Sequence, residues 1–142
     1  MKHLDKYAAY STRTFGSHIE SLIKRHLEHQ GLSFLCANYT KKCGEIDLVF
    51  EEDCGFIVFV EVRYRRNQRY GGARTSVNRR KLIKLNRTAQ AFLQQYKLLN
   101  RPARIDIVAV SPKKPRQCSG HGPLPSLSDL DIEWIKNAIE NN

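Results

Sequence analysis

Apolar residues recur with helical spacing in two parts of the chain and predict two helices. The first helix is expected over residues 18–30, where four residues form one apolar face: Ile19, Leu22, Ile23 and Leu27. Ser17 and Glu20 have the spacing of a capping box at its start, and Gly31 is a typical helix stop. The second helix carries a longer apolar seam, in steps of three and four residues: Leu82, Leu85, Ala89, Phe92, Tyr96 and Leu99.

Short apolar runs between turn residues predict the strands. They occupy residues 32–39, 45–51, 56–64 and 103–110, and the closing DIEWIKNAIE is expected to form a short strand or helix. This order of elements predicts an α/β fold with a central mixed β-sheet flanked by helices. The expected organisation has four parts: a flexible N-terminus at 1–13, a core domain at 14–110, a Pro/Gly-rich loop at 111–128, and a docked C-terminal element at 129–142.

The second and third strands form a hairpin that carries two carboxylates in its most apolar stretch. Because side chains alternate along a strand, one face of the second strand carries Ile46, Leu48 and Phe50, and one face of the third carries Phe56, Val58, Val60 and Val62. If these two faces coincide, that side of the hairpin is wholly apolar. The opposite face then carries Asp47 on one strand, and Glu61 with Arg63 on the other. An odd number of loop residues places Asp47 across from Glu61, whereas an even number sends Glu61 to the other face.

Two interpretations of this acidic pair are equally compatible with the residue pattern. Like charges opposite each other destabilise a sheet, and burial raises their pKa values, so a positive group must compensate. That group could be a Mg²⁺ ion, or it could be Arg63 with nearby arginines in a structural ion-pair network. Glu20 could add a third ligand if the first helix crosses the charged end of the sheet. Otherwise its role in the capping box fully explains a glutamate at this position.

The charge of the chain is +10, and the positive residues are concentrated in one segment. From Val62 to Ile105 there is no Asp or Glu, while the same span contains 13 Lys and Arg. A block of one sign predicts an anionic partner, with nucleic acid favoured over an anionic membrane because no apolar anchor accompanies it. The predicted nucleic-acid-binding residues are Arg65, Arg66, Arg69, Tyr70, Arg74, Arg79, Arg80, Lys81, Lys84 and Arg87.

The cysteines and the N-terminus bear on the compartment. The four cysteines form no CxxC pair and have no zinc-site spacing, so free thiols in a reducing cytoplasm are expected. No apolar stretch suits a signal peptide, and no run approaches the roughly 20 apolar residues of a membrane span. A soluble cytoplasmic protein without a membrane partner is therefore predicted.

Several of these motifs resemble the YraN-like family of small uncharacterised bacterial proteins. The resemblance covers about residues 14–110 and rests on Gly16 with Glu20, Asn38-Tyr39, GEIDLV, VFVEVR and YGGARTSVNRRK. It implies a restriction-endonuclease-like fold, similar to archaeal Holliday-junction resolvases. It also implies metal-binding roles for Asp47, Glu61 and Glu20, and it favours a metal site over a purely structural one.

Arg63 departs from the motif of such nucleases, which have lysine at this position. Arginine stays protonated and cannot act as a base, although it can stabilise a charged transition state. The expected function is a Mg²⁺- or Mn²⁺-dependent DNA endonuclease that uses Asp47, Glu61, Arg63 and Glu20. The alternative is an inactive DNA- or RNA-binding module with a structural acidic site, and a third possibility is a protein that docks an acidic partner. DNA is favoured over RNA, and a homodimer is possible.

Overall fold

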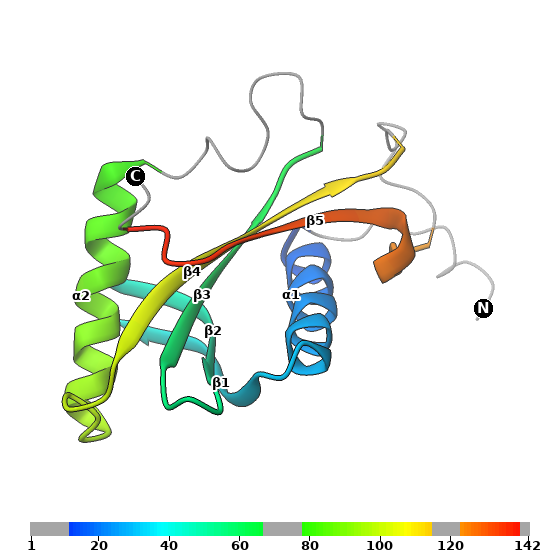
Figure 1. The fold of residues 1–142 in the computed structure, drawn as a ribbon. Helices are drawn as coiled ribbons and strands as arrows, with labels where there is room; N and C mark the ends of the chain where they lie inside the picture. The colour runs from blue at the N-terminus through cyan, green and yellow to red at the C-terminus, as the bar shows by residue number, and fades with distance from the viewer. Residues whose placement is uncertain (1–11, 67–77, 115–122, 140–142) are drawn as a thin grey trace, which may run out of the picture.

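The computed structural model describes residues 12–66, 78–114 and 123–139. It contains two α-helices, one short 3₁₀ helix and five strands in the described residues (Figure 1). In chain order they are α1 (Thr12–His29), β1 (Ser33–Lys41), β2 (Gly44–Glu51), β3 (Ile57–Tyr64), α2 (Arg79–Gln95), β4 (Ala103–Pro112), η3 (Leu127–Asp129) and β5 (Leu130–Ile135). No helix within these ranges has the length and apolar content needed to cross a membrane.

The five strands form one mixed sheet in the order β1-β2-β3-β4-β5. Neighbouring strands are antiparallel except β3 and β4, which are parallel. A parallel pair needs a crossover connection, and α2 lies within the one that joins β3 to β4. The expected α/β architecture, with a central mixed sheet between helices, is therefore confirmed.

The sheet has a helix on each face, so the protein has three layers and two apolar cores (Figure 1). The core under α1 includes Ile19, Ile23, Leu27, Leu48, Phe50, Val58, Val60 and Val108. The core under α2 includes Ile46, Val49, Ile57, Phe59, Leu85, Ala89, Phe92 and Ile107. Strands β2 and β3 contribute to both cores, which explains why their sequences are apolar almost throughout.

Helix α1 begins earlier than its sequence predicts. Thr12 is its first residue, so Ser17 lies inside the helix and the predicted capping box is wrong. The additional turn is stabilised by a tertiary contact, because the ring of Phe15 packs edge-on against Tyr64 with centroids 4.8 Å apart. The predicted stop at Gly31 is correct: this residue has φ +99°, and Leu32 N–H bonds back to the Leu27 carbonyl as in a Schellman motif.

Helix α2 is shorter than its apolar seam. Its N-cap is Asn78, whose side chain accepts a hydrogen bond from Lys81 N–H at 2.9 Å. The helix ends at Gln95, so the prediction that the seam continues through Tyr96 to Leu99 is wrong. Lys97 then adopts a positive φ, which turns Leu98 rather than Leu99 toward the core and leaves Leu99 61% exposed.

Candidate functional site

The acidic pair lies where β2 and β3 separate. Their ladder runs from Glu51 opposite Ile57 to Leu48 opposite Val60, so its next position sets Asp47 against Glu61. This confirms the register that an odd turn requires. At that position backbone pairing stops, and Asp47 Oδ2 instead accepts a hydrogen bond from Val62 N–H at 2.8 Å. The carboxylate is thereby fixed between two diverging strands.

Two arginines at the opposite end of the hairpin hold this register. Arg101 donates to the Gly55 carbonyl and pairs with Glu51, while Arg104 pairs with Glu52. Both arginines therefore fasten the turn between β2 and β3 to the start of β4. Because a slip of one residue would reverse the face of every side chain, these contacts help to keep Asp47 opposite Glu61.

The predicted apolar face of β2 is only partly correct. Leu48 and Phe50 pack in the core under α1, together with the expected residues of β3, but Ile46 packs in the core under α2. The change of side falls at Asp47, where β2 leaves β3. In the partner strand β1, Asn38 lies between the residues that pair with Leu48 and Ile46, and it has φ +53°.

Burial and mutual repulsion give the acidic pair unusual protonation. Burial, followed by the charge of Glu61, raises the pKa of Asp47 from 3.8 to about 8. Burial also raises the pKa of Glu61, against the opposing effect of Arg63. The two side chains hydrogen-bond to each other, and this contact raises the pKa of Asp47 and lowers that of Glu61. In this hydrogen bond Asp47 is therefore the proton donor and Glu61 the acceptor.

Two cations contact the buried Glu61. Lys81 Nζ lies 2.8 Å from Glu61 Oε1, and Arg63 Nη2 lies 3.4 Å from the same oxygen. The Glu61 side chain is only 6% exposed, whereas those of Lys81 and Arg63 are 35% and 24% exposed. Arg63 Nε is buried without a hydrogen-bond partner among the described residues. The ammonium of Lys81 is therefore the better-placed counterion.

Glu20 approaches the pair from α1. Burial, followed by the charges of Glu45 and Glu61, raises its pKa. The Asn38 amide lies 3.2 Å from Glu20 Oε2 and from Glu45 Oε1, and its nitrogen donates to both when it faces them. Glu20 lies inside α1 and does not cap it, so the predicted capping role is wrong. Its side chain instead lies beside the carboxylates of Glu45 and Glu61.

These residues fit a magnesium-type site with few protein ligands. Among the described residues, no three acidic, histidine or cysteine side chains converge closely enough to hold an ion by themselves. Mg²⁺ commonly needs only one or two carboxylates, because water and substrate phosphates complete its octahedron. Burial is the largest cause of the raised pKa values of Asp47, Glu61 and Glu20, and repulsion between carboxylates adds to it for Asp47 and Glu20.

The predicted nucleic-acid-binding residues divide into three groups. Arg69, Tyr70 and Arg74 lie outside the described residues, and Lys81 contacts Glu61. The remaining six are solvent-exposed at the end of β3 or along α2: Arg65, Arg66, Arg79, Arg80, Lys84 and Arg87. Because Lys81 joins α2 to the acidic pair, this basic helix borders the site directly.

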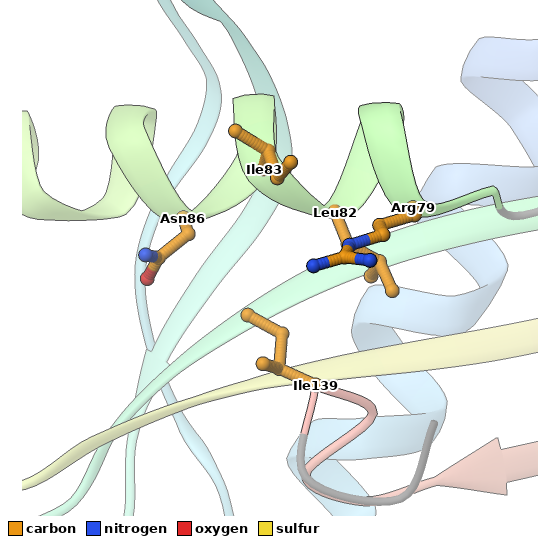
Figure 2. Close-up of a pocket in the computed structure, with 5 residues that line it drawn as sticks. All are labelled: Arg79, Leu82, Ile83, Asn86 and Ile139. Atoms are coloured by element: carbon orange, nitrogen blue, oxygen red, sulfur yellow. The ribbon is translucent and has the colours of Figure 1, made fainter.

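A separate pocket lies between α2 and the turn after β5. Its volume is about 570 Å³, and its lining consists of Arg79, Leu82, Ile83, Asn86 and Ile139 (Figure 2). The lining contains no carboxylate and none of the residues of the acidic pair. Metal-assisted chemistry needs those carboxylates, so the open end of the hairpin, not this pocket, is the candidate site.

Sequence reasoning missed three features of the site. Asn38 and Glu45 were not assigned to it, although an asparagine within a strand is a signal for the left-handed conformation that Asn38 adopts. Lys81 was expected on the nucleic-acid surface, not against Glu61. No periodicity could reveal that contact, because the two residues lie on different elements.

The family of the chain follows from comparison with other proteins. The model of the uncharacterised protein family UPF0102 matches residues 19–110. A UPF0102 protein from Vibrio parahaemolyticus is 41% identical over 131 residues, which cover 92% of this chain and 95% of the relative. One from Methylococcus capsulatus is 42% identical over 125 residues, 88% of this chain and 89% of the relative. The chain therefore belongs to the UPF0102 family, the YraN-like family that its motifs predict.

Proposed function

We propose that this protein binds nucleic acid and hydrolyses phosphodiester bonds in DNA with the help of Mg²⁺ or Mn²⁺. The observation that carries the proposal is the placement of Asp47 opposite Glu61 at the open end of the hairpin. Glu20 lies close enough to both for their charges to affect one another. Carboxylates in this arrangement suit a hard divalent cation, and the exposed cations of α2 suit the phosphates of a substrate.

In this proposal Asp47 and Glu61 hold the ion, and water and substrate oxygens complete its coordination, while the nearby charge of Glu20 assists as a third acidic group. The bound ion would activate water and neutralise charge that develops on the phosphodiester. Asp47 must first lose the proton that it shares with Glu61, and Val62 N–H continues to orient its second oxygen. Arg63 stays protonated and stabilises negative charge on the phosphate. Exposed arginines at the end of β3 and on α2 position the nucleic-acid backbone.

Cleavage of branched, single-stranded and duplex DNA in Mg²⁺ or Mn²⁺ tests the proposal. The informative variant is Asp47→Asn, because the amide can still accept from Val62 N–H and donate to Glu61 while it loses the charge that binds metal. Asp53→Asn is the matched control, since Asp53 lies in the exposed turn of the same hairpin. We expect cleavage by the wild type and by the control, and loss of cleavage in Asp47→Asn. Equal cleavage by all three would refute the metal assignment.

A nucleic-acid-binding protein without hydrolytic activity is the second candidate. From the sequence pattern alone Arg63 favours it, because the nucleases that the motifs resemble have lysine at this position. It predicts salt-sensitive binding without divalent-dependent cleavage. Each neutralised phosphate of duplex DNA contributes about 0.9 to the slope of log K against log salt. Binding titrations at several salt concentrations therefore measure how many phosphates the protein contacts under either proposal.

A further inference from the structure

The contact between Lys81 and Glu61 joins the acidic pair to the basic helix. Lys81 Nζ lies 2.8 Å from Glu61 Oε1, although the two residues belong to α2 and β3. Its neighbours Arg79 and Arg80 are exposed, whereas Lys81 is the residue of this basic triplet that contacts the acidic pair. Any ligand that changes the charge at Glu61 will therefore act on Lys81 as well.

The location of Lys81 is unfavourable for the stability of α2 itself. The first turn of the helix contains no acidic residue and begins with three cations, Arg79, Arg80 and Lys81. The N-terminus of a helix is positive, so cations there raise the free energy of the folded state. The contact with Glu61 offsets this cost for Lys81. Residues that conflict with local stability in this way commonly serve binding.

A divalent cation at Glu61 would compete with Lys81 for the same oxygen. The Lys81 side chain is 35% exposed, and its four-carbon stem is flexible, so its ammonium can leave Glu61 for solvent. Its backbone cannot move as freely, because Lys81 N–H donates to the N-cap side chain of Asn78. A displaced ammonium thus stays beside the first turn of α2, where Arg79 and Arg80 are exposed.

We propose that Lys81 couples metal binding to nucleic-acid binding. Its ammonium occupies Glu61 Oε1 until a divalent cation takes that oxygen, and it then pairs with a phosphate of the bound strand. The inference rests on the proposed metal site and adds a mechanism by which the two ligands bind cooperatively. Such coupling is reciprocal, so the cation tightens nucleic-acid binding by the same factor by which nucleic acid tightens cation binding.

The test combines two titrations on wild type, Lys81→Met and Lys84→Met. Calorimetry measures the affinity for Ca²⁺, which takes the same oxygen ligands as Mg²⁺, and fluorescence anisotropy measures the affinity for a labelled branched DNA with and without Ca²⁺. A denaturing gel verifies that the DNA remains intact. Lys84 is the matched control, because it presents the same charge from the next turn of α2 and is exposed.

We expect Ca²⁺ to tighten DNA binding by the wild type about tenfold, a typical coupling between two sites. Lys81→Met should bind Ca²⁺ about tenfold more tightly without DNA, because the competing ammonium is gone, and should lose most of the coupling. Lys81→Arg, which keeps the charge, should restore part of it. Lys84→Met should bind Ca²⁺ as the wild type does and lose DNA affinity equally with and without the cation.

Unchanged or weaker Ca²⁺ binding by Lys81→Met, or coupling as large as in Lys84→Met, would overturn the inference. Absence of Ca²⁺ binding by the wild type would overturn both the inference and the metal site. Coupling that depends on Lys81 in a protein without nuclease activity would refute the proposed hydrolysis alone. Asp47-dependent cleavage with unchanged coupling in Lys81→Met would refute this inference alone.

Discussion

The protonation of Asp47 makes the stability of this protein depend on pH in a direction that its structure specifies. The folded state raises the pKa of Asp47 to about 8, whereas its ordinary value is 3.8. Between these values the folded protein holds a proton that the unfolded chain has released. The free energy of unfolding must therefore fall as pH rises through this window, and the contribution is fully present only below the lower value.

The size of the effect follows from the same shift. A single group that titrates only in the unfolded state changes the free energy of unfolding by about 1.4 kcal/mol per pH unit. Asp47 is half-buried, and its contact with water reduces the effect, so we expect a loss of about 2–4 kcal/mol between pH 4.5 and 8. Asp47→Asn should remove this loss, because the amide keeps both hydrogen bonds and does not ionise.

Urea denaturation of both proteins at several pH values, in the presence of EDTA, measures the difference. Asp47→Asn should be about as stable as the wild type near pH 4.5 and more stable by about 2–4 kcal/mol near pH 8. Asp53→Asn, altered in the exposed turn, should follow the wild type throughout. Parallel profiles for wild type and Asp47→Asn would show that Asp47 is not protonated in the folded protein.

Three further predictions concern other parts of the chain. Hydrogen bonding to Arg104 lowers the pKa of Glu52 from 4.5 to about 2, so Glu52→Gln should cost about 1–2 kcal/mol at pH 7. Urea denaturation should show this difference shrink below about pH 4.5 and disappear as pH falls through about 2. Gly44→Ala should lower the free energy of unfolding, measured by thermal denaturation, by about 1–3 kcal/mol, because φ is +153° and a Cβ would lie 3.0 Å from Thr88 Oγ1. Gly55→Ala is the comparison, because Gly55 also has a positive φ, +100°, but only the Arg101 side chain lies near its Cβ position. Glu20→Gln should weaken Mn²⁺ binding measured by calorimetry several-fold and leave α1 helical by circular dichroism, since the residue caps nothing.

The sequence predicted those parts of the site that depend on strand period. Strand period reduced the possibilities to two registers, and only the odd one places Asp47 opposite Glu61. The structure selects that register. The start of α1 could not be predicted, because a chance capping box at Ser17 imitates a helix start. The contact that extends the helix, between Phe15 and Tyr64, joins residues far apart in the chain.

Other features depend on how strands separate and helices pack. Ile46 breaks the alternation of β2 because β2 separates from β3 at Asp47. The sequence of a single strand contains no sign of this separation. Leu99 continues the apolar seam of α2 but is exposed, because the backbone of Lys97 ends the helical path. Apolar spacing therefore located the elements, whereas their ends and the side reached by individual residues were decided by tertiary contacts.

The position of Lys81 changes how Arg63 bears on function. From the sequence, Arg63 alone stood beside the acidic pair, and an arginine there argued for a binding module without activity. The structure adds a lysine that reaches the same oxygen of Glu61 from α2 and approaches it more closely. An exchangeable ammonium is thus available at the site even though residue 63 is an arginine. The identity of residue 63 therefore no longer separates an active nuclease from an inactive one, and Arg63→Lys should alter cleavage less than Lys81→Met does.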